Sequence, residues 1–332
     1  MNVGEEKKIE VPETVEESLR RVAALVDGAS QVALACHVHP DGDALGSMLA
    51  LHHALRSMGR RSIASFPDPF VVAPHYRDLP GLDLMVPSHE FPAEPEVMIT
   101  FACGALARLG ELATNAKVAT TLVVIDHHVS NQRYGAINVI DAQAAASGVL
   151  VRRLIRELGI PLNRDSATCL YAALACDTGR FQHSNTTPEV FALASELATY
   201  DVPIASLSRS LFEEHRFSYL GLLADVLARV VLIPEYRFVW VSVTQNDLER
   251  HGVTYEEVEG LIDVIRSARE AEVACVLKEA ADGAYRVSMR SLGAVDVCSI
   301  AESEGGGGHR FAAGFTTDDP APVVIERILA AL

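Results

Sequence analysis

Metal-ligating side chains gather in a short stretch near the start of the sequence. Residues 37–43 read His-Val-His-Pro-Asp-Gly-Asp and directly follow the apolar run 32–36. Such a run is typical of a strand buried on both faces, and ligands of open α/β sheets collect beyond the carboxyl ends of these strands. Carboxylate oxygens beside an imidazole favour Mn²⁺, Mg²⁺ or Fe²⁺ over a thiolate-bound structural zinc. The stretch therefore predicts half of a metal site.

Two further clusters follow apolar segments in the same way. Asp126, His127 and His128 come after the apolar run 121–125, and Asp177 comes after a predicted helix at 165–176. Three clusters supply enough ligands for a two-metal centre, which clamps a phosphoryl group and generates hydroxide near neutral pH. The expected donors are His37, Asp41, Asp43, His127, His128 and Asp177.

A glycine-rich segment near the C-terminal end predicts an anion site. Gly305 to Gly308 let backbone N–H groups approach an anion closely, and His309 and Arg310 add donors beside them. The small residues after His309 predict a helix, whose N-terminus would also attract the anion. A flexible loop is the alternative interpretation. Arg290 is expected to contact the same anion. The alternative interpretation is that Arg290 is exposed and has only a structural role.

The elements that must position these residues alternate along the chain. Predicted strands at 31–37, 61–66, 97–102 and 121–126 interleave with predicted helices at 44–58, 105–114, 147–158 and 165–176. This alternation predicts a mostly parallel sheet covered by helices. The dipeptide His52-His53 is predicted to lie on a helix surface without a catalytic role.

A second, smaller α/β domain is predicted after a helical linker. Its strands are expected at 237–243, 271–277 and 285–290, and its helices at 255–268, 294–302 and 321–331. We expect a metal-binding catalytic domain at 1–187, a linker at 188–215 and a substrate-binding domain at 216–332, with the substrate cleft between the domains.

The charge and composition of the chain limit the kinds of molecule that it can bind. The formal net charge of −16 argues against a surface that holds long nucleic acid, because such binding depends on Lys and Arg neutralising phosphates. A small anionic substrate is still compatible with a locally positive cleft. No apolar stretch approaches the roughly 20 residues of a membrane span, and the first residues lack a signal peptide's apolar core. We therefore expect a cytoplasmic protein without membrane contact, whose six scattered cysteines are reduced.

These motifs, in this order, resemble the DHH phosphoesterase superfamily, and specifically its two-domain NrnA-type enzymes. The resemblance covers about residues 15–330 and rests on 37–47, Asp126-His127-His128, Asp177-Thr178-Gly179 and Gly305 to His309. Members hydrolyse short oligonucleotides and cyclic dinucleotides, and some are 3′,5′-bisphosphate nucleotidases. The resemblance implies two Mn²⁺ ions, with Mg²⁺ or another divalent cation as substitutes, and it is compatible with a homodimer.

The resemblance also implies a role for each residue. His37 and Asp41 would hold one cation, and Asp43, His127 and Asp177 the second. His128 would contact the phosphate or donate a proton, and Asp126 would complete the catalytic pair by orienting the histidines. The remote nucleotide or its terminal phosphate would be gripped by Arg290, Gly307, Gly308 and His309.

One position departs from the family pattern. The strand at 97–101 is normally followed by an aspartate that bridges both metals, but here Ala102 follows, upstream of the expected Arg108-Leu109-Gly110. Alanine has no lone pair to donate, so we expect weakened metal binding and little hydrolysis. Cys103 is not expected to substitute, because strand alternation turns it to the opposite face. An aspartate-to-alanine substitution and a natural loss of the aspartate both account for Ala102.

The expected function is a Mn²⁺-dependent phosphodiesterase that converts cyclic di-AMP, pApA and short oligoribonucleotides to mononucleotides, inactivated here by Ala102. The preference for cyclic di-AMP comes from the family resemblance rather than from any adenine-specific residue. Two alternatives stay open, namely a nucleotidase that removes phosphate from adenosine 3′,5′-bisphosphate (pAp) and a non-catalytic nucleotide sensor.

Overall fold

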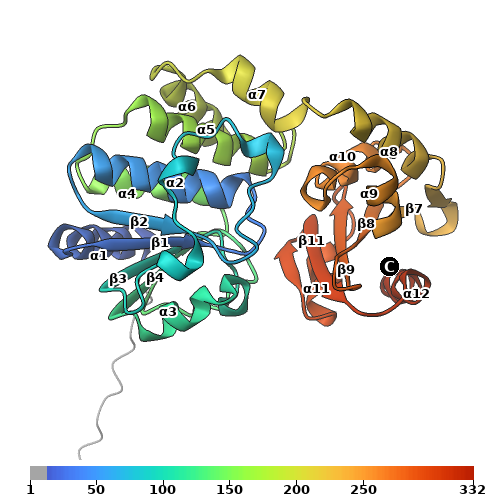
Figure 1. Ribbon diagram of the computed structural model, residues 1–332, viewed down its shortest axis with the longest axis horizontal. Coiled ribbons are helices and arrows are strands. Elements are labelled where there is room, and N and C mark those ends of the chain that lie inside the picture. Colours follow the sequence, from blue (N-terminus) through green and yellow to red (C-terminus); the bar gives the residue numbers. More distant parts are fainter. Residues whose placement is uncertain (1–12) are drawn as a thin grey trace, which may run out of the picture.

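The computed structural model describes residues 13–332 as two lobes, each built around one sheet (Figure 1). The first twelve residues of the predicted catalytic domain lie outside the described residues. The first sheet is entirely parallel, in the order β2-β1-β3-β4-β5. Its strands are β1 (Val32–Cys36), β2 (Ser62–Ser65), β3 (Val97–Phe101), β4 (Thr121–Asp126) and β5 (Ile137–Ile140). The predicted α/β architecture with a parallel first sheet is therefore confirmed, and β5 was not predicted.

Helices cover both faces of this sheet, which explains why every residue of β1 and β3 is buried. Helices α2, α4 and α5 lie over one face and α3 over the other (Figure 1). The segment 105–114, predicted as one helix, instead holds a 3₁₀ turn (Leu106–Leu109) followed by α3. The helices of the first lobe are α1 (Val15–Gly28), α2 (Gly42–Ser57), α3 (Leu112–Val118), α4 (Ser147–Glu157), α5 (Arg164–Asp177), α6 (Pro188–Ala198) and α7 (Ile204–Phe212).

Helix α2 is central to the site because it begins inside the first ligand cluster. Asp41 is its N-cap, and the Asp41 side chain accepts a hydrogen bond from Ala44 N at 2.9 Å. Gly42 lets α2 pack closely on α5, since a Cβ at this position would lie 2.2 Å from the sulfur of Cys176. This close approach brings the start of α2 next to the end of α5, where Asp177 lies.

The prediction that His52 lies on a helix surface is wrong. Its side chain is only 1% exposed, because α2 is covered by α4 and α5 as well as by the sheet. Its Nδ1 lies 2.9 Å from Ser62 Oγ, and its Nε2 is buried without a hydrogen-bond partner. Burial, with a smaller contribution from Arg56, lowers the pKa of His52 to about 4.

This buried imidazole predicts a pH dependence of stability. The unfolded chain protonates His52 near pH 6.5, whereas the folded chain does so only near pH 4. Between these values the unfolded state binds more protons, so His52 lowers the free energy of unfolding as the pH falls, by up to about 3 kcal/mol. Urea unfolding of His52→Gln from pH 7 to pH 4 should show a correspondingly weaker pH dependence. A control, His89→Gln at a 77% exposed side chain, should not, and equal slopes for both variants would contradict the assignment.

The second sheet is mixed, and only β7 and β8 run parallel within its order β10-β11-β9-β8-β7-β6. Its strands are β6 (Val231–Ile233), β7 (Phe238–Val243), β8 (Val273–Glu279), β9 (Tyr285–Ser291), β10 (Gly307–His309) and β11 (Ala312–Thr317). The helices of this lobe are α8 (Phe217–Leu227), α9 (Gln245–His251), α10 (Leu261–Ile265), α11 (Val297–Ser303) and α12 (Ala321–Ala331). The predicted helix 255–268 is a 3₁₀ turn (Tyr255–Val258) and α10, interrupted near Gly260.

The helix predicted after His309 does not exist. The glycine-rich segment forms β10, and the residues after it form β11, so the anion cannot use a helix N-terminus there. The glycines are required by close strand packing. Gly308 has a φ of +145°, and a Cβ at this position would meet the backbone oxygen of Ala312 at 2.5 Å.

The two faces of the second sheet have different partners. Val287, Met289 and Phe315 pack on one face against α11 and α12. On the opposite face, α8, α9 and α10 cover β7 and β8. Because side chains alternate, Arg286, Ser288 and Arg290 of β9 project from this second face, beyond the covered strands.

The segment between the sheets is helical, as predicted. Helices α6 and α7 contribute Val190, Leu197 and Leu207 to the core of the first lobe, and α8 contributes Leu222 to a core of the second. The domain limits at residues 187 and 215 stay predictions. Among residues 13–332, no helix has both the length and the apolar character needed to cross a bilayer.

Candidate functional site

Three adjacent strands of the first sheet end at one point. Cys36 of β1 is in register with Phe101 of β3, and Phe101 is in register with Ile125 of β4. The residues that follow these strands therefore lie side by side at the carboxyl edge, where ligands of such sheets bind. His37 lies on one flank, Asp126 on the other, and Ala102 between them.

Asp43, His127 and Asp177 form a compact three-ligand cluster. One ligand atom from each lies within 4.8 Å of the others. His127 Nε2 is 2.7 Å from Asp177 Oδ2 and 3.6 Å from Asp43 Oδ2. Asp43 accepts hydrogen bonds from the backbone N–H groups of Ser147 and Gly148 at 2.8 and 3.0 Å, so the N-terminus of α4 fixes its carboxylate.

The charges of this cluster suit a divalent cation. Burial and the nearby Asp177 carboxylate raise the pKa of Asp43 to about 7. Burial opposes protonation of His127, but the hydrogen bond and charge of Asp177 raise its pKa to about 10. His127 Nδ1 lies 3.0 Å from Ala144 O, so Nε2 is the ring nitrogen that faces the carboxylates of Asp177 and Asp43 and that would bind a cation in place of a proton. One imidazole nitrogen and two carboxylates form a donor set that fits Mn²⁺ or a similar divalent ion.

His37 and Asp41 form a looser pair. His37 is buried with an unpartnered Nε2, which lies 3.7 Å from Asp41 Oδ2. The Asp41 side chain is 52% exposed. Within the described part of the chain, the pair gathers no third ligand as closely as Asp43, His127 and Asp177 gather one another. The five predicted metal ligands thus lie as a compact trio and a looser pair.

Arg108 is a neighbour of this pair that the ligand prediction did not include. Its Nη2 lies 3.0 Å from His37 Nδ1, which is also 2.9 Å from Val38 O. A hydrogen bond from His37 to Val38 leaves Nε2 free for a cation, whereas accepting one from Arg108 places the proton on Nε2. The two contacts thus require different tautomers of His37, and the positive charge of Arg108 opposes a cation at this pair.

Ala102 occupies the position between the two groups of ligands. Its side chain is 1% exposed, and its backbone N donates to Ile125 O at 3.0 Å. Its φ is +48°, a region where aspartate and asparagine are far commoner than alanine. Cys103 packs with Met98 and Leu109 on the opposite side of the sheet, where burial raises its pKa, so it offers no replacement thiolate.

Asp126 orients the histidines rather than presenting a free carboxylate. It is fully buried, and its Oδ1 accepts from His127 N at 2.7 Å and lies 2.7 Å from His128 Nδ1. Its Oδ2 accepts from Asn131 Nδ2 at 2.5 Å. Burial opposes its charge, but His128 and these hydrogen bonds hold its pKa well below the ordinary value. His128 is therefore held through Nδ1, and its Nε2 is left for other partners.

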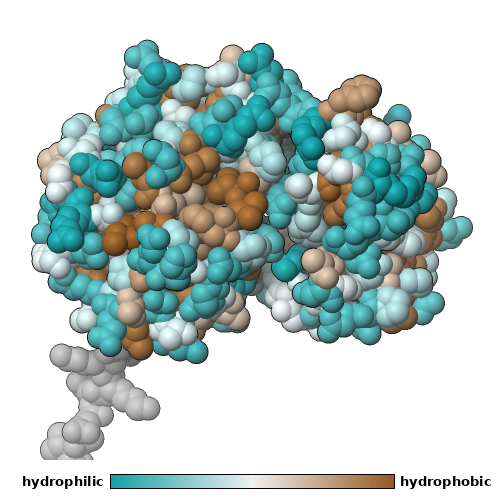
Figure 2. Space-filling model, viewed as in Figure 1, coloured by the Kyte–Doolittle hydropathy of each residue, from teal (hydrophilic) through white to brown (hydrophobic). Residues whose placement is uncertain are grey.

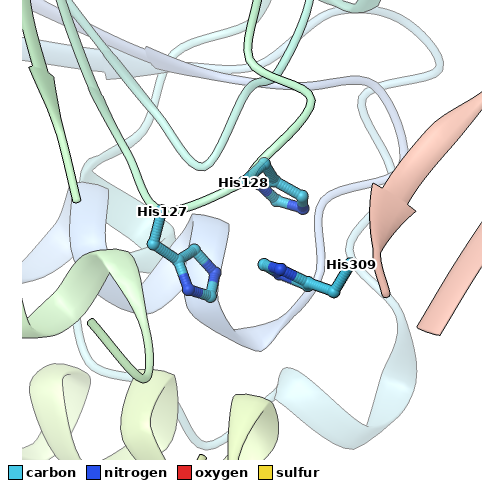
Figure 3. Close-up of side chains that lie close together, drawn as sticks. All are labelled: His127, His128 and His309. Atoms are coloured by element: carbon cyan, nitrogen blue, oxygen red, sulfur yellow. The ribbon is translucent and has the colours of Figure 1, made fainter. Parts of the chain in front are cut away.

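The second lobe reaches this site through β10. Figure 3 shows His309 beside His127 and His128, and the His309 and His128 rings stack with centroids 4.4 Å apart and planes 15° apart. Gly308 N donates to Ser130 Oγ at 3.3 Å across the boundary between the lobes. Burial and the two neighbouring imidazoles lower the pKa of His309 to about 2, so the ring is neutral.

Arg290 shares a sheet face with His309. Both are in register with Ala312 of β11, from opposite sides, so two strand spacings, or about 10 Å, separate them. The guanidinium of Arg290 donates to Met289 O at 3.0 Å. Gly307 lies on β10 next to Gly308, so the predicted substrate residues all lie on the β9–β11 part of the sheet.

Comparisons with known proteins agree with this arrangement. Residues 31–174 match the DHH family N-terminal domain, and residues 236–332 match the DHHA1 domain. The bifunctional oligoribonuclease and PAP phosphatase NrnA of Thermus thermophilus is 33% identical over 306 residues, covering 90% of this chain and 88% of that protein.

Solved structures share the fold. An exopolyphosphatase-related protein from Bacteroides fragilis has a TM-score of 0.84 at 23% identity and 95% coverage of each chain. RecJ from Thermus thermophilus, solved with Mn²⁺, has a TM-score of 0.54 at 16% identity, covering 95% of this chain and 54% of RecJ. The predicted family resemblance is confirmed, and the chain belongs to the DHH superfamily as an NrnA-type protein, with a DHH domain followed by a DHHA1 domain.

Proposed function

We propose that this DHH phosphoesterase binds short nucleotides between its two lobes and that Ala102 impairs their hydrolysis. The observation that carries the proposal is the Asp43, His127 and Asp177 cluster, which lies beside the His128–His309 stack contributed by both lobes. The name of the Thermus thermophilus relative supports short oligoribonucleotides and pAp as substrates. Within this substrate class, we propose cyclic di-AMP and its linear product pApA as the preferred substrates.

We assign two cation positions of unequal strength. Asp43, His127 and Asp177 form the stronger one, and His37 with Asp41 the weaker. RecJ, which shares the fold, was solved with Mn²⁺, and Mn²⁺ suits the oxygen and nitrogen donors of both positions. Divalent cations held there would neutralise the phosphate and polarise it toward attack.

The chain's own residues supply positioning and a proton. Asp126 holds His128 through Nδ1, so Nε2 is the atom that contacts the phosphate or protonates the leaving oxygen. Gly307, Gly308, His309 and Arg290 would hold the far end of the nucleotide on the second lobe. Fixing both ends favours short substrates, because only these place the scissile bond at the cluster.

A nucleotide-binding sensor is the second candidate function, and Ala102 is the observation that favours it. An intact cleft with an incomplete metal centre would hold its ligand without turnover. Activity in an Ala102→Asp variant separates the two candidates, because a sensor whose other residues have also lost function would stay inactive.

Calorimetric titration of the chain with Ala102 tests the proposal. We expect saturable binding of pApA, pAp or cyclic di-AMP in the presence of Mn²⁺, with one ligand per chain and little cleavage when the mixture is analysed by chromatography. A duplex of about 20 base pairs is the control and should not bind measurably at physiological salt. Absence of binding by all three small nucleotides would overturn the proposal.

A further inference from the structure

The turn that follows β4 carries a serine that contacts the second lobe and has no role in the function proposed above. Gly308 N donates to Ser130 Oγ at 3.3 Å, and Ser130 Oγ lies 3.4 Å from Gly308 O. Within the described part of the chain, no other hydrogen bond joins residues 13–212 to residues 217–332. In the space-filling view the surface is hollowed where the two lobes meet (Figure 2). Few polar contacts therefore fix the spacing of the lobes.

Ser130 is held in a fixed position relative to the metal cluster. The buried carboxylate of Asp126 accepts hydrogen bonds from His127 N and from the side chain of Asn131, on either side of Ser130. Asn131 N also donates to His128 O at 3.2 Å, which closes the turn. Asp126 thus anchors both ends of this turn. Because the turn begins with His127, a ligand of the compact trio, it connects Ser130 to the metal cluster without a loose segment.

On the second lobe, the partner of Ser130 is the edge of a sheet. β10 is the last strand of the second sheet and pairs with β11, where Gly308 is in register with Ala313. The backbone groups of Gly308 bond outside this pairing, since its N donates to Ser130 and its O accepts from Cys298 Sγ at 3.3 Å. An edge strand leaves such N–H groups in need of a partner. A hydroxyl accepts and donates at once, so Ser130 can serve both backbone groups.

The same contact determines where His309 lies. His309 follows Gly308 on β10, and its ring stacks on His128, which lies two residues before Ser130. The lobes therefore meet at the site through two neighbouring pairs, Ser130 with Gly308 and His128 with His309. Stacked rings can slide over each other at little cost, whereas a hydrogen bond is directional. The Ser130 contact is thus the one that fixes β10 relative to the turn.

We propose that Ser130 is a positioning residue that sets the spacing of the two lobes for a dinucleotide bound between them. The inference rests on the proposed function and adds to it the residue that aligns the second lobe with the metal cluster. Without this contact, a ligand that spans the lobes would have to order them as it binds, which costs affinity. The compact metal trio lies in the first lobe alone, so its affinity for Mn²⁺ should not depend on Ser130.

Hydrogen exchange tests the contact without a ligand. In Ser130→Ala the Gly308 N–H loses its acceptor, so we expect it to exchange with deuterium at least about tenfold faster, as measured by NMR on the full chain. Ser130→Thr keeps the hydroxyl and should keep the slow exchange. The matched control is Ser206→Ala, at an exposed serine on α7 whose hydroxyl donates to Pro203 O, and it should change nothing at Gly308. Equal exchange of Gly308 in folded Ser130→Ala and in the chain with Ala102 overturns the proposal.

Calorimetry with pApA and Mn²⁺ tests the consequence for binding. Ser130→Ala should bind pApA about tenfold more weakly than the chain with Ala102, whereas Ser130→Thr should bind it nearly as tightly. The affinity of the metal trio for Mn²⁺ should be unchanged in both variants. An unchanged pApA affinity in Ser130→Ala, a parallel loss of Mn²⁺ affinity, or no rescue by threonine overturns the positioning role. If the chain with Ala102 binds none of pApA, pAp and cyclic di-AMP, the proposed function fails, whereas the exchange of Gly308 still decides whether Ser130 joins the lobes.

Discussion

An Ala102→Asp variant should hydrolyse pApA or pAp at least about 100-fold faster than the chain with Ala102 in the presence of Mn²⁺. The position lies between His37 and Asp126 at the carboxyl edge of three adjacent strands, so a carboxylate there would face both cation positions. It would strengthen the weak His37 and Asp41 pair and offset the repulsion between two cations. A gain of this size corresponds to about 2.7 kcal/mol in the activation free energy, a modest demand on a group that would organise two ions. The measurement is initial rate by chromatography at saturating Mn²⁺.

The matched control is Ala102→Asn, which has the same shape without the charge. Both side chains tolerate the φ of +48° better than alanine, so neither variant should be less stable than the chain with Ala102. We expect no comparable gain for asparagine, because it cannot neutralise the cations. Equal rates for the two variants, or no gain in a folded and metal-loaded Ala102→Asp, would contradict the role assigned to this position.

Cation binding should show a similarly large contrast between the two groups of ligands. Asp177→Asn should weaken the tightest Mn²⁺ site by about 100-fold or more, because it removes a ligand from the compact trio with Asp43 and His127. Asp41→Asn, at a half-exposed residue of the weaker pair, should change the tight site less than about tenfold. Titration of the free Mn²⁺ signal by electron paramagnetic resonance measures both affinities.

The same titration should separate the chain with Ala102 from the Ala102→Asp variant. We expect one tight Mn²⁺ per chain with Ala102 and a second, much weaker one, with the second tightened in the aspartate variant. Arg108 contributes to the weakness, since it lies 3.0 Å from His37 Nδ1. Two equally tight ions in the chain with Ala102 would show that the site does not need a carboxylate at residue 102.

The first sheet and the ligand clusters could be predicted from sequence because their signals are local. The run before His37 and the run before Asp126 are continuously apolar, as strands buried on both faces must be. The same rule places their ends at one edge of the sheet. This explains why residues that are about 90 positions apart in sequence could be expected in one site.

Two strands of the second sheet were less predictable because they are rich in glycine. β10 and the first half of β11 consist of glycine, alanine and one histidine, which have low strand propensity and resemble a helix or a loop in sequence. Pairing with β9, which lies earlier in the chain, decides the conformation of β11, and β10 in turn pairs with β11. The prediction that His52 lies on a helix surface failed for a related reason, since the helices that bury it come much later in the chain.

Several features of the site depend on contacts between the lobes, which no local pattern reports. The stack of His128 on His309 and the pairing of His39 with Tyr255 each join residues more than 180 positions apart. His128 and His309 lie in motifs that can be recognised in the sequence, but Tyr255 lies in none. Arg108 was visible in its Arg-Leu-Gly context, yet only the structure shows that it contacts His37.

The most direct test is a crystal structure of the chain with Ala102 grown with Mn²⁺ and pApA, with the cations located by anomalous scattering. We predict an intact dinucleotide between the lobes and one strong anomalous peak among Asp43, His127 and Asp177, with little or none beside His37. Two fully occupied Mn²⁺ ions with cleaved nucleotide in the same crystal would contradict it.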